Sequence, residues 1–364
     1  MKKLIWIVII LVIVGAVWLS GGEKTEAEPI KIGALLSLSG DASAWGENAQ
    51  RAIQLATEKV NEQGGIDGRK VEIIYEDTGG DPKRAVSGFQ KLTSIDQVTA
   101  IIGPLNQTED VAVMPLIKQI GIPTIVPGYV PLQNRADLSN PLLVWMDAEV
   151  EAGRLAEHVF NQGTRTVGVI GTLDSWESTV TKGFSEKFKS LGGTVTVEEI
   201  IQPQAAEARS SVTKILATKP QAVYLGTYYQ FINSTKALSD LGYKGKVFSI
   251  EVDNYLAGET SGWTSGLQFI APDYYQDVFV NMFETRFGQA PGLPAGQAYD
   301  ATNVLFSFLD QGVNREKIVE AMKKFNGYEG VSGKLQIAPD GRTSLPTALF
   351  ELQDGKVIRL NTLN

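Results

Sequence analysis

The stretch IKIGALLSLSG, residues 30–40, joins a continuous apolar run to a tail of small polar residues. An apolar run of this length with β-branched residues predicts a buried strand that ends in a loop. The stretch RTVGVIGTLDS, residues 165–175, repeats the pattern and opens a second series of apolar and helical segments. Strands that alternate with helices indicate parallel sheets covered on both faces. We therefore expect two doubly wound α/β lobes that face one another.

Both series continue along the chain. The predicted strands are 30–38, 70–76, 98–102, 124–126, 166–171, 194–200, 222–226 and 246–250. Helix-period segments lie between them, because their apolar residues recur every three or four positions. Beyond residue 266 the order changes, and helices are predicted over 274–288, 298–310 and 315–325. The tail 335–360 predicts strands joined by the turns Asp340-Gly341 and Asp354-Gly355.

The N-terminus carries the clearest indication of cellular location. Lys2 and Lys3 precede an apolar run from Leu4 to Leu19, which predicts a signal peptide or a membrane anchor. As a helix the run rises about 24 Å, against roughly 30 Å of hydrocarbon, so a cleaved signal and an uncleaved anchor both stay open. Residues 1–28 are then a targeting segment plus a solvated linker, and the remainder is expected outside the cytoplasm.

Composition excludes several classes of function. The 364 residues contain no cysteine and one histidine, which rules out thiolate chemistry and a multi-histidine metal site. The net charge of −8 argues against a nucleic-acid-binding protein. No predicted strand end offers a nucleophile beside a base, and no phosphate-binding Gly-Lys-Ser/Thr loop is present. We expect neither an enzyme, nor a cofactor, nor a metal.

Ligands of open α/β sheets bind beyond the carboxyl ends of the strands. Trp45 follows the first strand, in what reads as a loop of small residues, and Trp176 stands at the equivalent junction of the second series. If the lobes face each other, the two rings can enclose a small ligand. The alternative for each ring is packing against its own helix.

Two further junctions carry polar groups. Asn106 and Glu109 have capping-box spacing, and the helix that follows presents free N–H groups suited to an anion. Glu251 and Asp253 follow an apolar strand. They are interpreted either as a solvated loop or as counter-ions for a ligand ammonium group in a dry cleft.

The same junctions resemble a known family, the branched-chain amino-acid-binding proteins of ABC importers, which have a type I periplasmic binding protein fold. The resemblance covers nearly everything from Ile30 onward. It is carried by IKIGALLSLSGDASAWG, VNEQGGIDGRKVEIIYEDTGGDPKRAV, IIGP, MPLIKQIGIPTIVPG and VYLGTYY.

The resemblance implies a two-lobe clamp with three hinge crossings, near Asp147, Ala271 and Glu329. Lobe 1 would comprise 29–147 and 272–328, and lobe 2 would comprise 148–271 and 329–364. It also implies an extracytoplasmic location and the membrane subunits of an ABC permease as partners. We expect a monomer that does not bind nucleic acid.

The resemblance also implies a binding site. Trp45 matches an aromatic position of the family, Trp176 stands where a tyrosine is usual, and Glu251 matches the residue that holds the ligand's α-ammonium group. Two positions depart, because Gln107 replaces a serine that grips the α-carboxylate and Val130 replaces a threonine. The full set of candidates is Trp45, Gln107, Thr108, Gly128, Tyr129, Trp176, Tyr228 and Glu251.

The expected function is capture of a small amino-acid-like or amine-bearing ligand between the lobes and its delivery to an ABC importer. The retained carboxylate favours an amine, an amide or an amino acid, and the lost hydroxyl groups favour a less anionic compound. The alternative is a ligand-sensing ectodomain of the same fold that signals through a partner chain.

Overall fold

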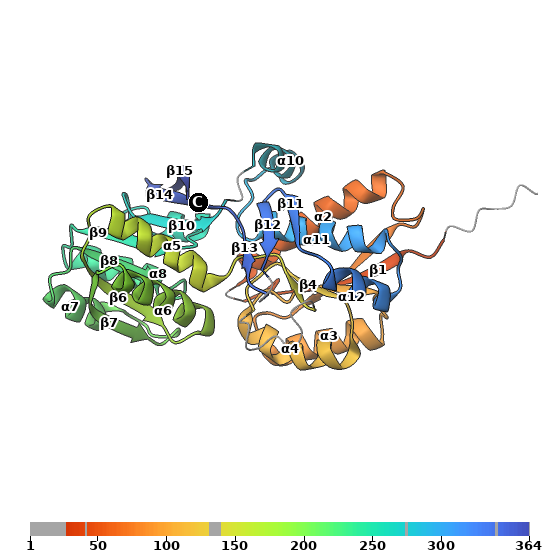
Figure 1. The fold of residues 1–364 in the computed structure, drawn as a ribbon, viewed down its shortest axis with the longest axis horizontal. Coiled ribbons are helices and arrows are strands. Elements are labelled where there is room, and N and C mark those ends of the chain that lie inside the picture. The colour runs from red at the N-terminus through yellow and green to blue at the C-terminus, as the bar shows by residue number, and fades with distance from the viewer. Residues whose placement is uncertain (1–26, 41, 131–139, 274–275, 339–340, 364) are drawn as a thin grey trace, which may run out of the picture.

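The structure is a computed structural model that describes residues 27–40, 42–130, 140–273, 276–338 and 341–363. It contains two α/β lobes that lie side by side along the long axis of the molecule (Figure 1). The predicted two-lobe α/β architecture is confirmed. The apolar run from Leu4 to Leu19 and Asp340 of one predicted turn lie outside the described residues.

Lobe 1 is built on a five-stranded parallel sheet of order β2-β1-β3-β4-β5. Its strands are β1 (Ile30–Leu36), β2 (Val71–Asp77), β3 (Ala100–Ile102), β4 (Thr124–Val126) and β5 (Leu142–Leu143). The helices that follow the first three strands are α2 (Ser43–Glu62), α3 (Pro82–Ser94) and α4 (Gln107–Ile120). Alternate residues of β1 face opposite cores, because Leu35 packs with α3 and α4 whereas Leu36 packs with α2.

Lobe 2 contains a seven-stranded sheet of order β15-β14-β10-β9-β8-β6-β7. Its parallel strands are β6 (Thr166–Thr172), β7 (Thr194–Ile201), β8 (Ala222–Gly226), β9 (Lys246–Ile250) and β10 (Gln268–Pro272). The antiparallel strands β14 (Thr347–Gln353) and β15 (Lys356–Leu363) complete one edge. The helices are α5 (Ala148–Asn161), α6 (Ser175–Ser190), α7 (Arg209–Ala217), α8 (Phe231–Asp240) and α9 (Asn254–Glu259).

The predicted turn between the last two strands is confirmed. Asp354 and Gly355 have φ values of 49° and 77°, the left-handed conformation that a tight hairpin turn needs at both central positions. Aspartate tolerates this conformation better than most residues, and glycine adopts it without a steric penalty.

The chain returns to lobe 1 after β10. The returning elements are α10 (Asp277–Phe287), α11 (Ala295–Leu309), α12 (Arg315–Lys323), β11 (Gly327–Gly330), β12 (Gly333–Ile337) and β13 (Thr343–Ser344). Figure 1 shows α11 and α12 within lobe 1, and α10 at the upper edge of the molecule, where it contacts α2. On lobe 1, α11 packs against α2.

The third crossing lies later in the chain than the predicted position near Glu329. The carboxylate of Asp300, on α11, accepts hydrogen bonds from the N–H groups of Val331 at 2.9 Å and Ser332 at 2.8 Å. These bonds attach the β11–β12 hairpin to lobe 1. The chain therefore crosses into lobe 2 between Ser344 and Thr347, where β14 begins.

The strand ends that matter for function meet at the seam. One cleft is lined by residues that come shortly after the ends of several strands. These strands are β1, β2 and β3 in lobe 1 and β6, β7, β8 and β9 in lobe 2. Within the part of the chain that the structure describes, no helix has the length and apolar character to cross a membrane. The described residues also contain no cluster of three or more His, Cys, Asp or Glu side chains that could hold a metal ion.

Candidate ligand-binding cleft

A cleft of about 530 Å³ lies between the two lobes. Lobe 1 contributes the turn after β2, with Gly79 and Gly80, and the residues at the start of α4. Lobe 2 contributes the loops after β6, β7, β8 and β9. The site is therefore located where the sheet topology predicts it, at the carboxyl ends of parallel strands.

Trp45 lies in the first turn of α2, and not in a loop as the sequence suggested. Helix α2 can begin this early because Gly46 lacks a side chain: a Cβ there would lie 2.0 Å from the carbonyl oxygen of Ser37. The helix thus packs directly on the end of β1. This close approach fixes the position of the half-buried Trp45 ring in the cleft wall.

Trp45 joins the two lobes through its ring contacts. Its ring centroid lies 5.7 Å from that of Trp145, at the lobe 1 end of the first crossing, and 6.2 Å from that of Tyr228 in lobe 2. Trp176 lines the cleft from α6 and also packs against the core of lobe 2. Both alternatives for these tryptophans therefore hold in part, since each ring contacts its own core and lines the cleft.

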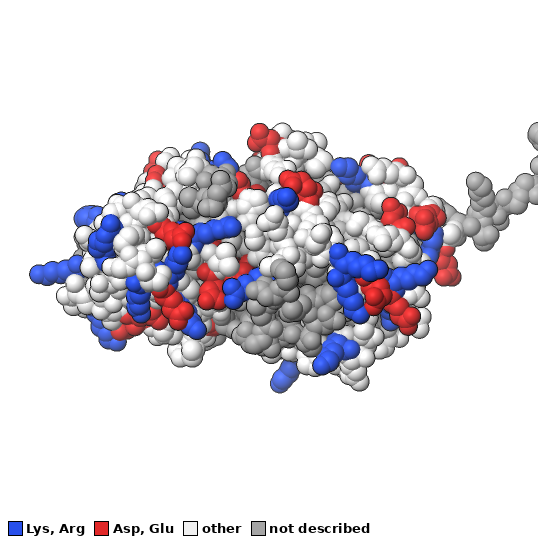
Figure 2. Space-filling view, viewed as in Figure 1, with Lys and Arg blue, Asp and Glu red and all other residues white. Residues whose placement is uncertain are grey.

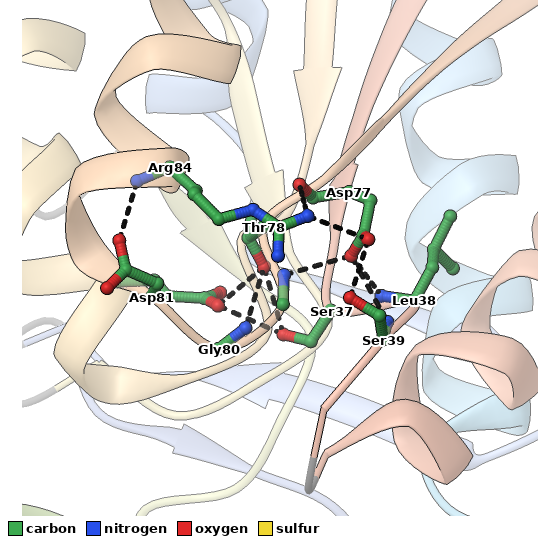
Figure 3. Close-up of polar contacts among 10 residues, drawn as sticks. Ser37, Leu38, Ser39, Asp77, Thr78, Gly80, Asp81 and Arg84 are labelled. Atoms are coloured by element: carbon green, nitrogen blue, oxygen red, sulfur yellow. Dashed lines mark hydrogen bonds and ion pairs between the residues drawn. The ribbon is translucent and has the colours of Figure 1, made fainter.

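Asp77 fixes the loop that leads into α2. Its carboxylate accepts hydrogen bonds from the N–H of Leu38 at 2.9 Å and from the hydroxyl of Ser39 at 2.7 Å. It also accepts from the N–H of Gly79 at 2.9 Å and from the guanidinium of Arg84 at 2.8 Å (Figure 3). Burial alone would raise the pKa of Asp77, but these donors together lower it.

A second network lies behind the Asp77 loop. The Glu109 carboxylate accepts from the hydroxyls of Ser37 at 3.0 Å and Thr78 at 2.5 Å. Asn106 occupies the N-cap of α4, as predicted, but its amide donates to Ser37 at 2.8 Å and makes no cap hydrogen bond. Burial raises the pKa of Glu109, and it raises that of the adjacent Asp110 well above its usual range.

The remaining lobe 1 candidates occupy different positions. Thr108 and Tyr129 line the cleft. Gly128 is buried behind the wall, where a Cβ would lie 3.1 Å from the carbonyl oxygen of Leu105. Gln107 begins α4, and its side chain lies outside what the structure describes. The side chain of Val130 is buried in the lobe 1 core, so it cannot replace the threonine hydroxyl that the resemblance implies.

Glu251 projects into the cleft from the end of β9. The residue is 3% exposed, and its Oε1 accepts a hydrogen bond of 3.1 Å from Nε1 of Trp145. Its backbone has a φ of 51°, which costs a residue with a Cβ roughly 1–2 kcal/mol. A strained backbone at a cleft residue is typical of functional sites.

Glu151, on α5, forms a buried acid pair with Glu251. Burial raises the pKa of Glu251 to about 7, and the interactions with Glu151 and Trp145 offset this only in part. Burial, followed by the charge of Glu251, raises the pKa of Glu151 well above its usual range. Close carboxyl groups in a dry site cannot both ionise readily, so this pair retains a proton to higher pH than two separate exposed carboxyl groups would.

The residues predicted from the sequence include neither Trp145 nor Glu151. Trp145 stands two residues before the predicted crossing at Asp147, so an aromatic ring at a hinge could have been recognised as a cleft candidate. Glu151 has no such indication, because it lies in an ordinary amphipathic helix and meets Glu251 only through tertiary packing.

Glu177 and Asp253 organise the lobe 2 wall. Oε1 of Glu177 accepts from the N–H groups of Tyr228 at 2.8 Å and Tyr229 at 3.0 Å. The Tyr228 hydroxyl donates to Asp253 at 3.0 Å, and Asp253 caps α9 through the N–H of Leu256 at 2.8 Å. Asp253 is therefore buried and structural, and the interpretation as a solvated loop is wrong for both carboxylates.

Comparisons with known proteins agree with this architecture. A family model described as "Periplasmic binding protein" matches residues 29–356. "Leu/Ile/Val-binding protein homolog 3" of Brucella melitensis is 23% identical over 356 residues, which cover 91% of this chain and 93% of that protein. "Leu/Ile/Val-binding protein BraC3" of Rhizobium johnstonii is 25% identical over 202 residues, and this match covers 55% of each chain.

Solved structures show the same fold. A leucine-binding protein from Thermotoga maritima superposes with a TM-score of 0.82 at 22% identity, covering 92% of this chain and 99% of that one. A solute-binding protein from R. palustris in complex with benzoate gives a TM-score of 0.77 at 20% identity, covering 92% and 96%. The predicted type I periplasmic binding protein fold is thus confirmed, and proteins that share it bind chemically different ligands.

Proposed function

Because this chain belongs to the periplasmic binding protein family, we propose that it is an extracytoplasmic solute-binding protein of an ABC importer. It captures a small amino-acid-like or amine-bearing molecule between its lobes and delivers it to the membrane permease. The observation that carries this proposal is the buried Glu251 carboxylate in a cleft lined by aromatic rings of both lobes.

Capture proceeds by closure of the clamp. The ligand first contacts the Trp45 face of lobe 1, and lobe 2 then closes over it. Leu173 and Tyr229 line the lobe 2 side of the cleft while remaining 59% and 49% exposed, so closure buries apolar surface that is open to water. Contacts made only in the closed state shift the equilibrium toward that state.

The crossings between the lobes provide the hinge. The N–H of Asp147 in the first crossing donates to the carbonyl of Thr343 at 2.9 Å. Arg154, just beyond this crossing, donates to the carbonyl of Leu345 at 3.1 Å and to the hydroxyl of Thr347 at 3.0 Å. The first and third crossings are therefore hydrogen-bonded to each other, and they rotate as one unit when the lobes move.

Binding is tested by a thermal-shift screen of amino acids, amides, amines and small carboxylates, followed by calorimetry on each hit. A ligand at 100 times its Kd adds about 2.7 kcal/mol of stability. Glu251→Gln should weaken an amine-bearing ligand at least about tenfold, because the amide carries no charge. Glu259→Gln makes the same change at an exposed position on α9 and should leave affinity unchanged.

Equal affinity in wild type and Glu251→Gln would remove Glu251 from the binding site. A screen without any ligand would contradict the proposed function as a whole. Delivery to an importer is tested by uptake of the labelled ligand in cells that carry or lack the gene, and the location by fractionating those cells. Light scattering tests the expected monomer.

A further inference from the structure

The charged residues that line the cleft are all acidic within the part of the chain that the structure describes. They are Asp174, Glu177 and Glu251, and no described lining residue is a lysine or an arginine. Asp174 is engaged in capping α6, since it accepts from the N–H of Trp176 at 3.0 Å. Glu177 and Glu251 remain as the buried charges that a ligand would meet.

Glu177 supplies an oxygen with unused hydrogen-bonding capacity. Oε1 accepts two backbone N–H groups, whereas Oε2 is buried without a well-formed hydrogen bond among the described residues, with the hydroxyls of Thr172 and Thr227 beside the carboxyl group. The residue is only 1% exposed. A buried carboxylate oxygen without a well-formed hydrogen bond is costly, and an ammonium group in the cleft would satisfy it.

The aromatic rings form a corner in the same cleft. The ring plane of Trp145 is inclined by 41° to that of Trp45, and the plane of Tyr228 is inclined by 82°. Tyr129 and Trp176 line the cleft as well. Rings set at different angles present several π faces to one volume, and such faces attract cations that have lost water.

The lobe 1 wall, in contrast, presents no cationic side chain to a carboxylate among its described residues, although Thr108 and Trp45 carry a hydroxyl and an indole N–H there. The N–H of Gly79 is bonded to Asp77, and the amide of Asn106 is bonded to Ser37. The N-terminus of α4 would favour an anion. Its first turn, however, already holds Glu109 and Asp110.

From these observations we infer that the ligand is an organic ammonium ion without a carboxylate, held by Glu251 and Glu177 within the aromatic corner of Trp45, Trp145 and Tyr228. The inference rests on the proposed function and narrows its ligand class. It separates this chain from the structural relative in complex with benzoate, whose ligand is an anion.

Two matched sets of compounds test the inference by calorimetry. Leucine is compared with 3-methylbutylamine, which lacks the carboxylate, and with 4-methylpentanoate, which lacks the ammonium group. Phenylalanine, 2-phenylethylamine and 3-phenylpropanoate form the second set. In at least one set the amine should bind about tenfold or more tightly than the amino acid, and the carboxylate should bind most weakly. Glu251→Gln should abolish this preference, and Glu259→Gln should retain it.

If in both sets the amino acid binds as tightly as its amine, or the carboxylate binds most tightly, the inference is overturned and the proposed function still stands. Absence of binding by both amines would also overturn it. The proposed function would fail separately, if the broad solute screen yields no ligand at all.

Discussion

Asp77 in lobe 1 and Glu251 in lobe 2 are carboxylates at or just after the end of a parallel strand, and their surroundings differ. Asp77 accepts five hydrogen bonds from side chains and loop N–H groups of Leu38, Ser39, Gly79 and Arg84, and its pKa is lowered. Glu251 accepts a bond from Trp145 and faces another carboxyl group, and its pKa is raised to about 7. The first carboxylate fixes a loop of its lobe, whereas the second retains binding capacity for a ligand.

The largest expected effect comes from Asp77→Asn. An amide cannot accept from all the donors that the carboxylate satisfies, and it loses the charge that pairs with Arg84. We expect a loss of about 2 kcal/mol in the free energy of unfolding, because hydrogen bonds to charged groups contribute roughly 1.5–3 kcal/mol each and this site is partly exposed. Urea denaturation measures the change. A variant as stable as wild type would show that the Asp77 network does not hold the loop.

The next prediction concerns Glu251 and is that ligand affinity depends on pH. With a pKa of about 7, this carboxyl group is mostly charged at pH 8 and mostly protonated at pH 6. An ammonium ligand prefers the charged form, so its Kd should rise about tenfold between pH 8 and pH 6. Calorimetry at several pH values checks this. An affinity that stays constant over this range would show that the acid pair does not contact the cationic group.

Replacing Glu151 by glutamine should stabilise the protein at high pH. Both pair members have folded pKa values above their unfolded values, so the folded state binds more protons and loses stability as pH rises toward and through about 7. Glu151→Gln leaves one carboxylate and a neutral donor beside it. We expect a gain of about 1 kcal/mol at pH 8 and little change at pH 5. Thermal melting at both pH values measures it, and destabilisation at pH 8 would contradict the pairing.

The smallest effect is expected on the surface. Figure 2 shows basic and acidic side chains interspersed over both lobes on the face in view. Lys182 and Glu186, for example, form an exposed pair at 3.8 Å on α6. Lys182→Ala should change stability by less than about 0.5 kcal/mol, because exposed pairs contribute little. A larger loss in the free energy of unfolding, measured by urea denaturation, would contradict the view that this exposed ion pair contributes little to the stability of lobe 2.

The sequence predicts the lobes better than it predicts their junction. Strands 124–126, 222–226 and 246–250 have the predicted bounds, because buried strands between helices leave a local apolar pattern. The third crossing was misplaced because the hydrogen bonds that Asp300 accepts from Val331 and Ser332 join residues about thirty positions apart in the chain. No local pattern records such a contact.

In the candidate site, too, some residues are indicated by a local sequence pattern and others are brought in only by contacts between distant parts of the chain. Glu251, Trp176 and Tyr228 come shortly after strand ends, so the topology rule alone places them beside one cleft. Trp145 and Glu151 come from the crossing and from the helix after it, and only the packing of the two lobes brings them to Glu251. Reading Trp45 as a loop residue was wrong because Gly46 allows the helix to begin against the end of β1.

The most direct test is a crystal structure of the protein with the tightest-binding amine of the two compound sets. We expect the amine nitrogen in contact with the Glu251 carboxylate and within about 6 Å of the centroids of the Trp45 or Trp145 rings. A ligand bound outside the cleft, or bound inside it with its nitrogen turned toward lobe 1 and away from Glu251, would contradict this expectation.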